Sequence, residues 1–397
     1  MFTTDTKMNA KLLKIPLWLL SVDDIALLLS ARTSAQILVI EKTLRFVNIF
    51  ARETDDARAY KNSVIASALL EILSSGRGPA RIRDQVLAIL ARYNTEDLNA
   101  ETKIVQPGYT RTLRQCINID ASGKMHSIEL VEAKLQEFVI DDINLSMPDG
   151  SYKYTLNDLL DSLDFALIDE GVWKSEETYD SVNFLKIRLQ NLIKSDAAKY
   201  FDLDYVDTEG FINGLFKNDD GTQANIVNFN ISFIDDRLAK TITKIYSKLI
   251  FDYSKSLDER ASIPTNIILE EAHRYVQNDE DVDVIGYNIF ERICKEGRKY
   301  GVLLGFISQR PLELSETCIS QSSNYLIFKM THVRDLEFIR GSVPYVTNEM
   351  VERIQSLAPG TLLAFGKSFN MPISVDLKMP EPSPSSESAR VFEAWYK

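Results

Sequence analysis

The hydrophobic positions in the first hundred residues recur at the spacing of amphipathic helices. From Pro16 to about Tyr93, apolar residues return every three or four positions, and glycines separate the later runs Ala59–Leu73 and Ala80–Tyr93. This pattern predicts a helical bundle over residues 1–100. Its simplest role is that of a packing module inserted into a larger fold.

The segment 101–220 has a mixed pattern. Alternating apolar and polar residues in CINID, HSIELVEA and EFVIDDINL predict short strands, with a turn at Pro107-Gly108. Helical spacing returns from Thr155 to Ala198, where Thr155 or Asn157 is the expected N-cap. We therefore expect a second insertion that contains both strands and helices.

After Gly221, short apolar runs alternate with amphipathic helices. Continuously apolar strands between such helices are typical of a mostly parallel sheet with helices on both faces. Residues 221–378 therefore predict an α/β core, and the Pro/Ser-rich residues 379–397 predict an extended or flexible tail. The strand candidates of this core are 224–234, 266–271, 302–309, 325–330, 361–366 and 373–377.

The overall composition is that of an ordinary globular protein, with 45% hydrophobic and 26% charged residues among 397. No window approaches ~18 consecutive apolar residues, so no membrane span is expected. The three cysteines, Cys116, Cys294 and Cys318, are far apart in the sequence and lack metal-ligand spacing. A reducing, cytoplasmic location is therefore the expectation.

The formal net charge of −12 argues against a generally basic surface that wraps nucleic acid. It leaves room for a local basic ring in the pore of an oligomer, where a few cations from each subunit add up. Lys329 and the cluster Arg77–Arg83 are the candidates for such contacts.

Two adjacent carboxylates stand at the end of an apolar run in NIILEEAHRYV, Asn266–Val276. In an open parallel sheet, ligands bind beyond the carboxyl ends of the strands, which is where Glu270 and Glu271 fall. One acid can hold a hydrated Mg²⁺ while the other orients or deprotonates a water, as in a Walker B strand. The alternative, of equal weight for this motif alone, is a solvated strand end before a helix.

The next strand, in VLLGFISQRP, also ends in polar residues. Ser308, Gln309 and Arg310 follow it where a polar sensor would contact an attacking water or a γ-phosphate. Turn chemistry before Pro311 is the alternative. The order of these motifs after the paired acids favours a phosphoryl-transfer site over chance.

Between the two strands, KEGRKYG places Lys295, Arg298 and Lys299 at the end of a predicted helix. Cations suit the helix dipole there, which is the structural interpretation. The functional alternative is an arginine finger that reaches the nucleotide of a neighbouring subunit.

Together, NIILEEAHRYV, EGRKYGVLLGFISQRP and TLLAFG resemble the HerA branch of the HerA/FtsK hexameric DNA-translocating ATPases. LKIPLWLLSVDDIALLL and IVNFNISFIDDRLAKTITKIYSKLIFDY also resemble that family, so the likeness covers about residues 12–380. It implies a RecA-like P-loop NTPase core that uses ATP and Mg²⁺. It also implies a homohexamer around double-stranded DNA, with a nuclease or an NADase as effector partner in DNA repair or antiphage defence.

The same resemblance implies roles for individual residues. Glu270 would be the magnesium-associated acid, Glu271 the catalytic base, Gln309 the sensor and Arg298 the trans-acting finger. Two further residues have weaker assignments: Arg340 is a second finger candidate or the partner of a nearby acid, and His273 is a hydrogen-bonding neighbour rather than a metal ligand.

One part of such a site is missing from the sequence. The family needs a Walker A loop, G-x-x-x-x-G-K-[ST], to cradle the phosphates. The nearest string, GTLLAFGKS at Gly360–Ser368, has five residues between its glycines and predicts a β-hairpin. We expect the loop to lie upstream of residue 1 in a longer protein, or to be lost in a shortened homologue. As written, the chain is not expected to bind ATP tightly alone.

Three functions are therefore weighed. The leading one is the C-terminal part of a HerA-like DNA translocase. The second is a non-catalytic assembly subunit that lacks its own P-loop. A DExH-type helicase is the third and weakest, because it rests on EEAH alone and SQRPLELSE lacks the motif Q-x-x-G-R-x-G-R.

Overall fold

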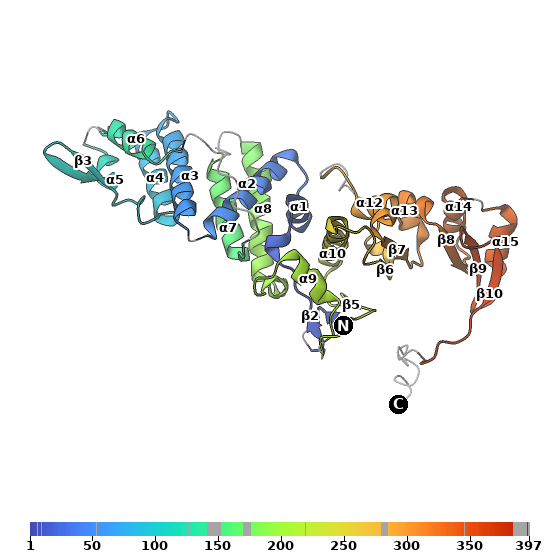
Figure 1. Cartoon of the computed structure of the whole chain (residues 1–397). Coiled ribbons are helices and arrows are strands. Elements are labelled where there is room, and N and C mark those ends of the chain that lie inside the picture. The colour runs from blue at the N-terminus through green and yellow to red at the C-terminus, as the bar shows by residue number, and fades with distance from the viewer. Residues whose placement is uncertain are drawn as a thin grey trace. The chain divides into compact units, whose positions relative to one another are not determined.

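The computed structural model divides the chain into two compact units, one up to residue 245 and one from residue 246 onward, apart from the short segment 281–286. Figure 1 shows both units, which are described separately. Their helices and strands confirm the predicted mixed α/β class. The structure describes all residues except 6, 9, 53, 122, 126, 141–151, 170–175, 219, 279–284, 345, 384–394 and 396–397.

The first unit is dominated by helices, as the hydrophobic pattern predicted. Phe165 lies at the centre of an aromatic cluster in its core, with ring centroids 5.2 Å from Phe46, 5.3 Å from Phe50 and 4.9 Å from Tyr93. The helices are α1 (Val22–Leu29), α2 (Ser34–Phe50), α3 (Asp55–Leu73), α4 (Pro79–Arg92), α5 (Leu113–Cys116), α6 (Ile128–Gln136), α7 (Leu156–Asp169), α8 (Glu176–Lys194) and α9 (Thr208–Leu215), with 3-10 turns η1 (Leu17–Leu19) and η3 (Asp196–Phe201). A tenth labelled helix, α10 (Asp236–Ser256), follows them along the chain.

Side-chain caps explain where several of these helices begin. Ser21 and Asp24 form a reciprocal capping box at α1, and Thr33 with Gln36 forms another at α2. The hydroxyl of Thr155 accepts the backbone N–H of Asp158 at 3.2 Å, which confirms Thr155 as the N-cap of α7.

Two small sheets belong to the first unit. Strands β1 (Phe2–Thr3), β2 (Lys11–Leu12) and β5 (Phe229–Asn230) pair in parallel, in the order β2-β1-β5. Strands β3 (Lys103–Gln106) and β4 (Tyr109–Thr112) form an antiparallel hairpin. Its turn lies at the predicted Pro107-Gly108, where Gly108 adopts a φ of 91°.

One predicted strand is a helix instead. HSIELVEA was expected to alternate as a strand, but Ile128–Gln136 forms α6. Val131 and Leu135, four residues apart, are both fully buried, and α6 packs against α3. The helical spacing of these two side chains therefore decided the outcome over the short alternating run.

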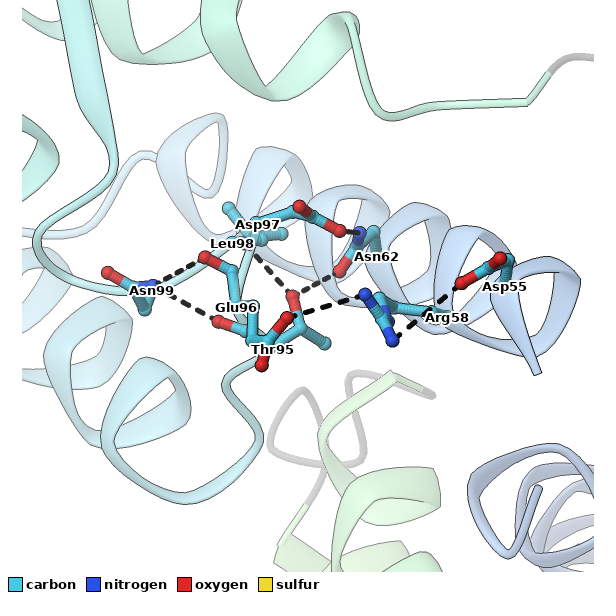
Figure 2. A network of polar contacts seen from close by, with 8 residues as sticks. All are labelled: Asp55, Arg58, Asn62, Thr95, Glu96, Asp97, Leu98 and Asn99. Atoms are coloured by element: carbon cyan, nitrogen blue, oxygen red, sulfur yellow. Dashed lines mark hydrogen bonds and ion pairs between the residues drawn. The ribbon is translucent and has the colours of Figure 1, made fainter. Parts of the chain in front are cut away.

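The loop that follows α4 is fastened to α3 by a polar network (Figure 2). Asn62 of α3 is 4% exposed, and its side chain accepts a hydrogen bond from the Thr95 hydroxyl and donates to Asp97 at 3.3 Å. Arg58 of the same helix lies 3.4 Å from the Glu96 carboxylate. A buried amide that satisfies two loop residues fixes the path of the chain into the β3–β4 hairpin.

The second unit contains the strands that carry the candidate chemistry. Strands β6 (Thr265–Leu269) and β7 (Val302–Phe306) pair in parallel, and β8 (Asn324–Phe328), β9 (Thr361–Gly366) and β10 (Ile373–Asp376) form an antiparallel sheet in the order β10-β9-β8. Its helices are α12 (Ile289–Glu296), α13 (Glu316–Gln321), α14 (Val333–Ser342) and α15 (Asn348–Ser356), with 3-10 turns η4 (Ala272–Arg274), η5 (Gly297–Tyr300) and η6 (Pro311–Glu313).

The string Gly360–Ser368 lies on β9, which pairs with β8 and β10. The predicted β-hairpin is therefore confirmed, and this string forms a strand instead of a phosphate-binding loop. Within the described residues, no helix combines the length and the apolar character that crossing a membrane requires.

Candidate active site

The carboxyl ends of β6 and β7 lie side by side. Their parallel register pairs Leu269 with Phe306. The backbone pairing continues past both strands, because the Ile307 N–H donates to Leu269 at 2.9 Å and the Ala272 N–H donates to Ile307 at 2.8 Å. The residues that follow β6 are therefore neighbours of those that follow β7, which is the edge of a parallel sheet where ligands bind.

Glu271 has an unusual backbone conformation at this edge. Its φ of 50° and ψ of 44° place it in the left-handed region, which a residue with a Cβ occupies at a cost of about 1–2 kcal/mol. The turn allows the chain to leave β6 and enter η4. Backbone outliers of this kind cluster at functional sites, so the conformation itself favours a functional interpretation of Glu271.

Both carboxylate oxygens of Glu271 have partners. Gln309 donates its side-chain N–H to Oε1 at 3.1 Å, and His273 Nδ1 lies 3.3 Å from Oε2. The same Nδ1 lies 3.2 Å from the hydroxyl of Ser308. The structure thus brings together the acid, the amide and the histidine that were singled out in the sequence. The Glu271 side chain is still 40% exposed, so a water can reach it.

Glu270 differs from its neighbour. It is exposed, and none of the residues that the structure describes forms a hydrogen bond or an ion pair with its carboxylate. No group of three or more potential metal ligands exists within the described residues. A single exposed carboxylate fits Mg²⁺, which usually keeps several waters and takes only one or two carboxylates from the protein together with phosphate oxygens.

The cations near the site are not equivalent. Arg310 is paired with Glu313 at 3.0 Å, and Lys295 lies 3.7 Å from Glu291. Arg298, in η5, is exposed and pairs with none of the described residues. It forms no hydrogen bond or ion pair with Glu271, so a role for Arg298 at this chain's own carboxylates has no support in the geometry.

The alternative finger candidate, Arg340, lies exposed on α14. A nearby acid was the expected partner, but Arg340 forms no ion pair with any acid in the described part of the chain.

Two cysteines that are far apart in the sequence interact in the structure. Cys294 lies on α12 and Cys318 on α13, and interaction with the Cys294 thiol together with burial raises the pKa of Cys318. The hydroxyl of Ser315, the N-cap residue of α13, donates to Glu291 of α12 at 2.7 Å. Glu291 precedes Cys294 by three residues, as Ser315 precedes Cys318. This matched spacing is the sequence signal for the contact, and it can be interpreted only once α12 and α13 are known to pack together.

No family model matches the chain. "Probable helicase MJECL08" of Methanocaldococcus jannaschii is 36% identical over 152 residues, which are 36% of this chain and 29% of that protein. The "DNA double-strand break repair helicase HerA" of Sulfurisphaera tokodaii is 26% identical over 264 residues, 65% of this chain and 50% of that helicase. Among solved structures, the plasmid coupling protein TrwB in complex with a non-hydrolysable ATP analogue has a TM-score of 0.42 at 12% identity, over 59% of this chain and 57% of that one.

The fold and the site define a mixed α/β protein in which a glutamate beyond the end of β6 hydrogen-bonds to a glutamine beyond the end of the parallel strand β7. Within that class, the chain is HerA-like in sequence, as its similarity to these helicases shows. The chain spans half or less of the length of these relatives.

Proposed function

We propose that this chain supplies the Walker B and sensor half of an ATP-hydrolysis site in a DNA-translocating ATPase. The observation that carries the proposal is the 3.1 Å hydrogen bond from Gln309 to Glu271 across two neighbouring strand ends. A carboxylate beside a side-chain amide is suited to take a proton from a water and to orient that water. The likeness to HerA helicases supports ATP as the substrate.

Each of the four residues has a distinct role in this proposal. Glu271 is the general base, and Gln309 orients both the carboxylate and the attacking water. Glu270 holds the hydration shell of Mg²⁺, and Mg²⁺ when bound neutralises charge on the phosphates. Arg298 reaches the nucleotide of a neighbouring subunit, which is consistent with its exposure and its lack of a described partner.

At the level of the assembly, we propose a homohexameric ring that moves double-stranded DNA through its pore, together with a nuclease or NADase effector. A ring is the arrangement in which Arg298 could serve a second subunit. The excess of acidic side chains, −12 in net charge, restricts DNA contact to local basic positions.

Glu271→Gln in the full-length protein tests the assignment. The amide keeps the shape and an acceptor for Gln309 but cannot take a proton, so hydrolysis should fall by about 10²–10⁴-fold while ATP binding survives. Glu313→Gln is the matched control, since Glu313 pairs with Arg310 beyond the end of β7, the neighbouring strand. Turnover by Glu271→Gln at the wild-type rate would reject the base.

A non-catalytic scaffold subunit is the second candidate. It is favoured by one observation: the string most similar to a phosphate-binding loop, Gly360–Ser368, lies on strand β9. ATP titration of the full-length protein separates the two. Absence of saturable binding supports the scaffold, whereas binding with hydrolysis removes it.

A further inference from the structure

His273 lies between the ends of β6 and β7, and the proposed function assigns it no role. It belongs to η4, directly after the turn at Glu271, and its side chain is only 14% exposed. Its Nδ1 faces two oxygens at once, Oε2 of Glu271 at 3.3 Å and Oγ of Ser308 at 3.2 Å. Ser308 is itself fixed, because its Oγ accepts the backbone N–H of Arg310 at 3.0 Å.

We propose that His273 is a positioning residue that holds the second carboxylate oxygen of Glu271, opposite the oxygen held by Gln309. This inference rests on the proposed function, and it concerns how the base is aimed. An ionised carboxylate only accepts hydrogen bonds, so the Nδ1 of His273 must carry the proton that is shared with Glu271. With the proton on Nδ1, the Ser308 Oγ at 3.2 Å can only accept, so this N–H lies between the serine oxygen and Oε2 of Glu271.

The geometry explains why such a second contact is needed. Glu271 is 40% exposed and has a long, flexible side chain, so one hydrogen bond from Gln309 would leave its carboxylate free to turn. Gln309 at one oxygen and the Nδ1 of His273 beside the other restrict both the place and the plane of the carboxylate. A lone pair is then aimed at one point in space, where a water must sit to be deprotonated.

The expected effect is on turnover and not on nucleotide binding. Displacement of a catalytic group by about 1 Å can cost on the order of 100-fold in rate. Loss of the His273 donor should therefore lower kcat for ATP hydrolysis by about 10- to 100-fold. KM for ATP should stay unchanged, because His273 contacts the carboxylate and the sensor strand rather than a phosphate.

Two substitutions in the full-length protein separate positioning from packing. His273→Asn keeps a nitrogen donor at the same number of bonds from the backbone as Nδ1, but it loses bulk. His273→Leu keeps the bulk and loses the donor. Positioning predicts a kcat near wild type for His273→Asn and the full loss for His273→Leu, with equal thermal stability. His332→Leu is the matched control, since His332, the exposed N-cap of α14, also has its Nδ1 beside a carboxylate, that of Asp335 at 3.1 Å.

The outcomes are distinct. A higher kcat for His273→Leu than for His273→Asn, or wild-type kcat for both, overturns the positioning role. Equal loss in both variants also overturns it, because the donor then contributes nothing beyond the packing of the ring. If Glu271→Gln itself hydrolyses ATP normally, the proposed function fails instead, whatever the His273 variants do.

Discussion

Gly297 joins α12 to the turn that carries Arg298, and its substitution tests how tightly this junction is packed. A Cβ at Gly297 would overlap the backbone carbonyl oxygen of Val302, the first residue of β7, and would lie 2.9 Å from Cγ2 of Ile293. The φ of Gly297 is −53°, which any residue adopts. The obstacle to Gly297→Ala is therefore space alone, and the obstructing atom is backbone, which cannot rotate away.

The magnitude follows from two opposing effects. Overpacking against fixed atoms costs about 1–3 kcal/mol, and a backbone obstacle places Gly297→Ala toward the upper end of that range. Replacing glycine by alanine also removes freedom from the unfolded chain, which stabilises by about 0.4–1 kcal/mol. The free energy of unfolding should therefore fall by about 1–2 kcal/mol.

Urea unfolding followed by circular dichroism measures the change, and hydrogen exchange in α12 and β7 locates it. With an m value of about 1–3 kcal/mol per molar, the midpoint should drop by roughly 0.3–2 M. Gly341→Ala is the matched control. Gly341 lies in α14, and a Cβ there meets nothing within 4 Å, so this variant should gain about 0.4–1 kcal/mol. A Gly297→Ala midpoint that rises together with that of Gly341→Ala would refute the packing argument.

Two further predictions concern polar groups that are buried or half-buried. Asn62→Ala should lower the unfolding free energy by about 1–3 kcal/mol, because it leaves the Thr95 hydroxyl without its acceptor. Asn94→Ala, at an exposed position, is the control and should change the unfolding free energy by less than about 0.5 kcal/mol. Equal urea midpoints for the two variants would contradict the prediction. Burial raises the pKa of Tyr325 to about 12, so the folded state keeps its phenol proton and the resulting stability is lost as pH rises from about 10, the ordinary tyrosine value. Tyr325→Phe loses the hydroxyl donation to two carbonyl oxygens, which should lower the unfolding free energy by about 1 kcal/mol at pH 7. This difference in stability between the variant and the wild type should narrow between about pH 10 and 12. Urea midpoints that stay equally far apart over this pH range would refute the linkage.

Long periodic segments were the predictable part of this fold. The helical spacing between Pro16 and Tyr93 corresponds to α1–α4, and apolar runs mark β6, β7, β8 and β9. Short segments were less predictable, because several patterns fit them equally well. The candidate 224–234 contains only the two-residue strand β5, and α6 lies where alternation predicted a strand.

For the site, the order of motifs predicted which residues would meet, because consecutive parallel strands end at the same edge. Glu271 and Gln309 are 38 residues apart in the sequence and hydrogen-bond in the structure. Their catalytic roles, like those of Glu270 and Arg298, stay predictions until turnover is measured. The Cys294–Cys318 contact was missed because it depends on how α12 and α13 face each other, which no pattern along one strand or helix encodes.

The left-handed turn at Glu271 could not be predicted for a different reason. Glycine and asparagine are the residues that commonly adopt a positive φ, so a glutamate there gives no turn signal in the sequence. A glycine would make the same turn without the conformational cost, but it would leave Gln309 and His273 with nothing to hold. The strained backbone and the doubly held carboxylate therefore support the same conclusion: the side chain at this position, and not the turn alone, is what the second unit is built to present.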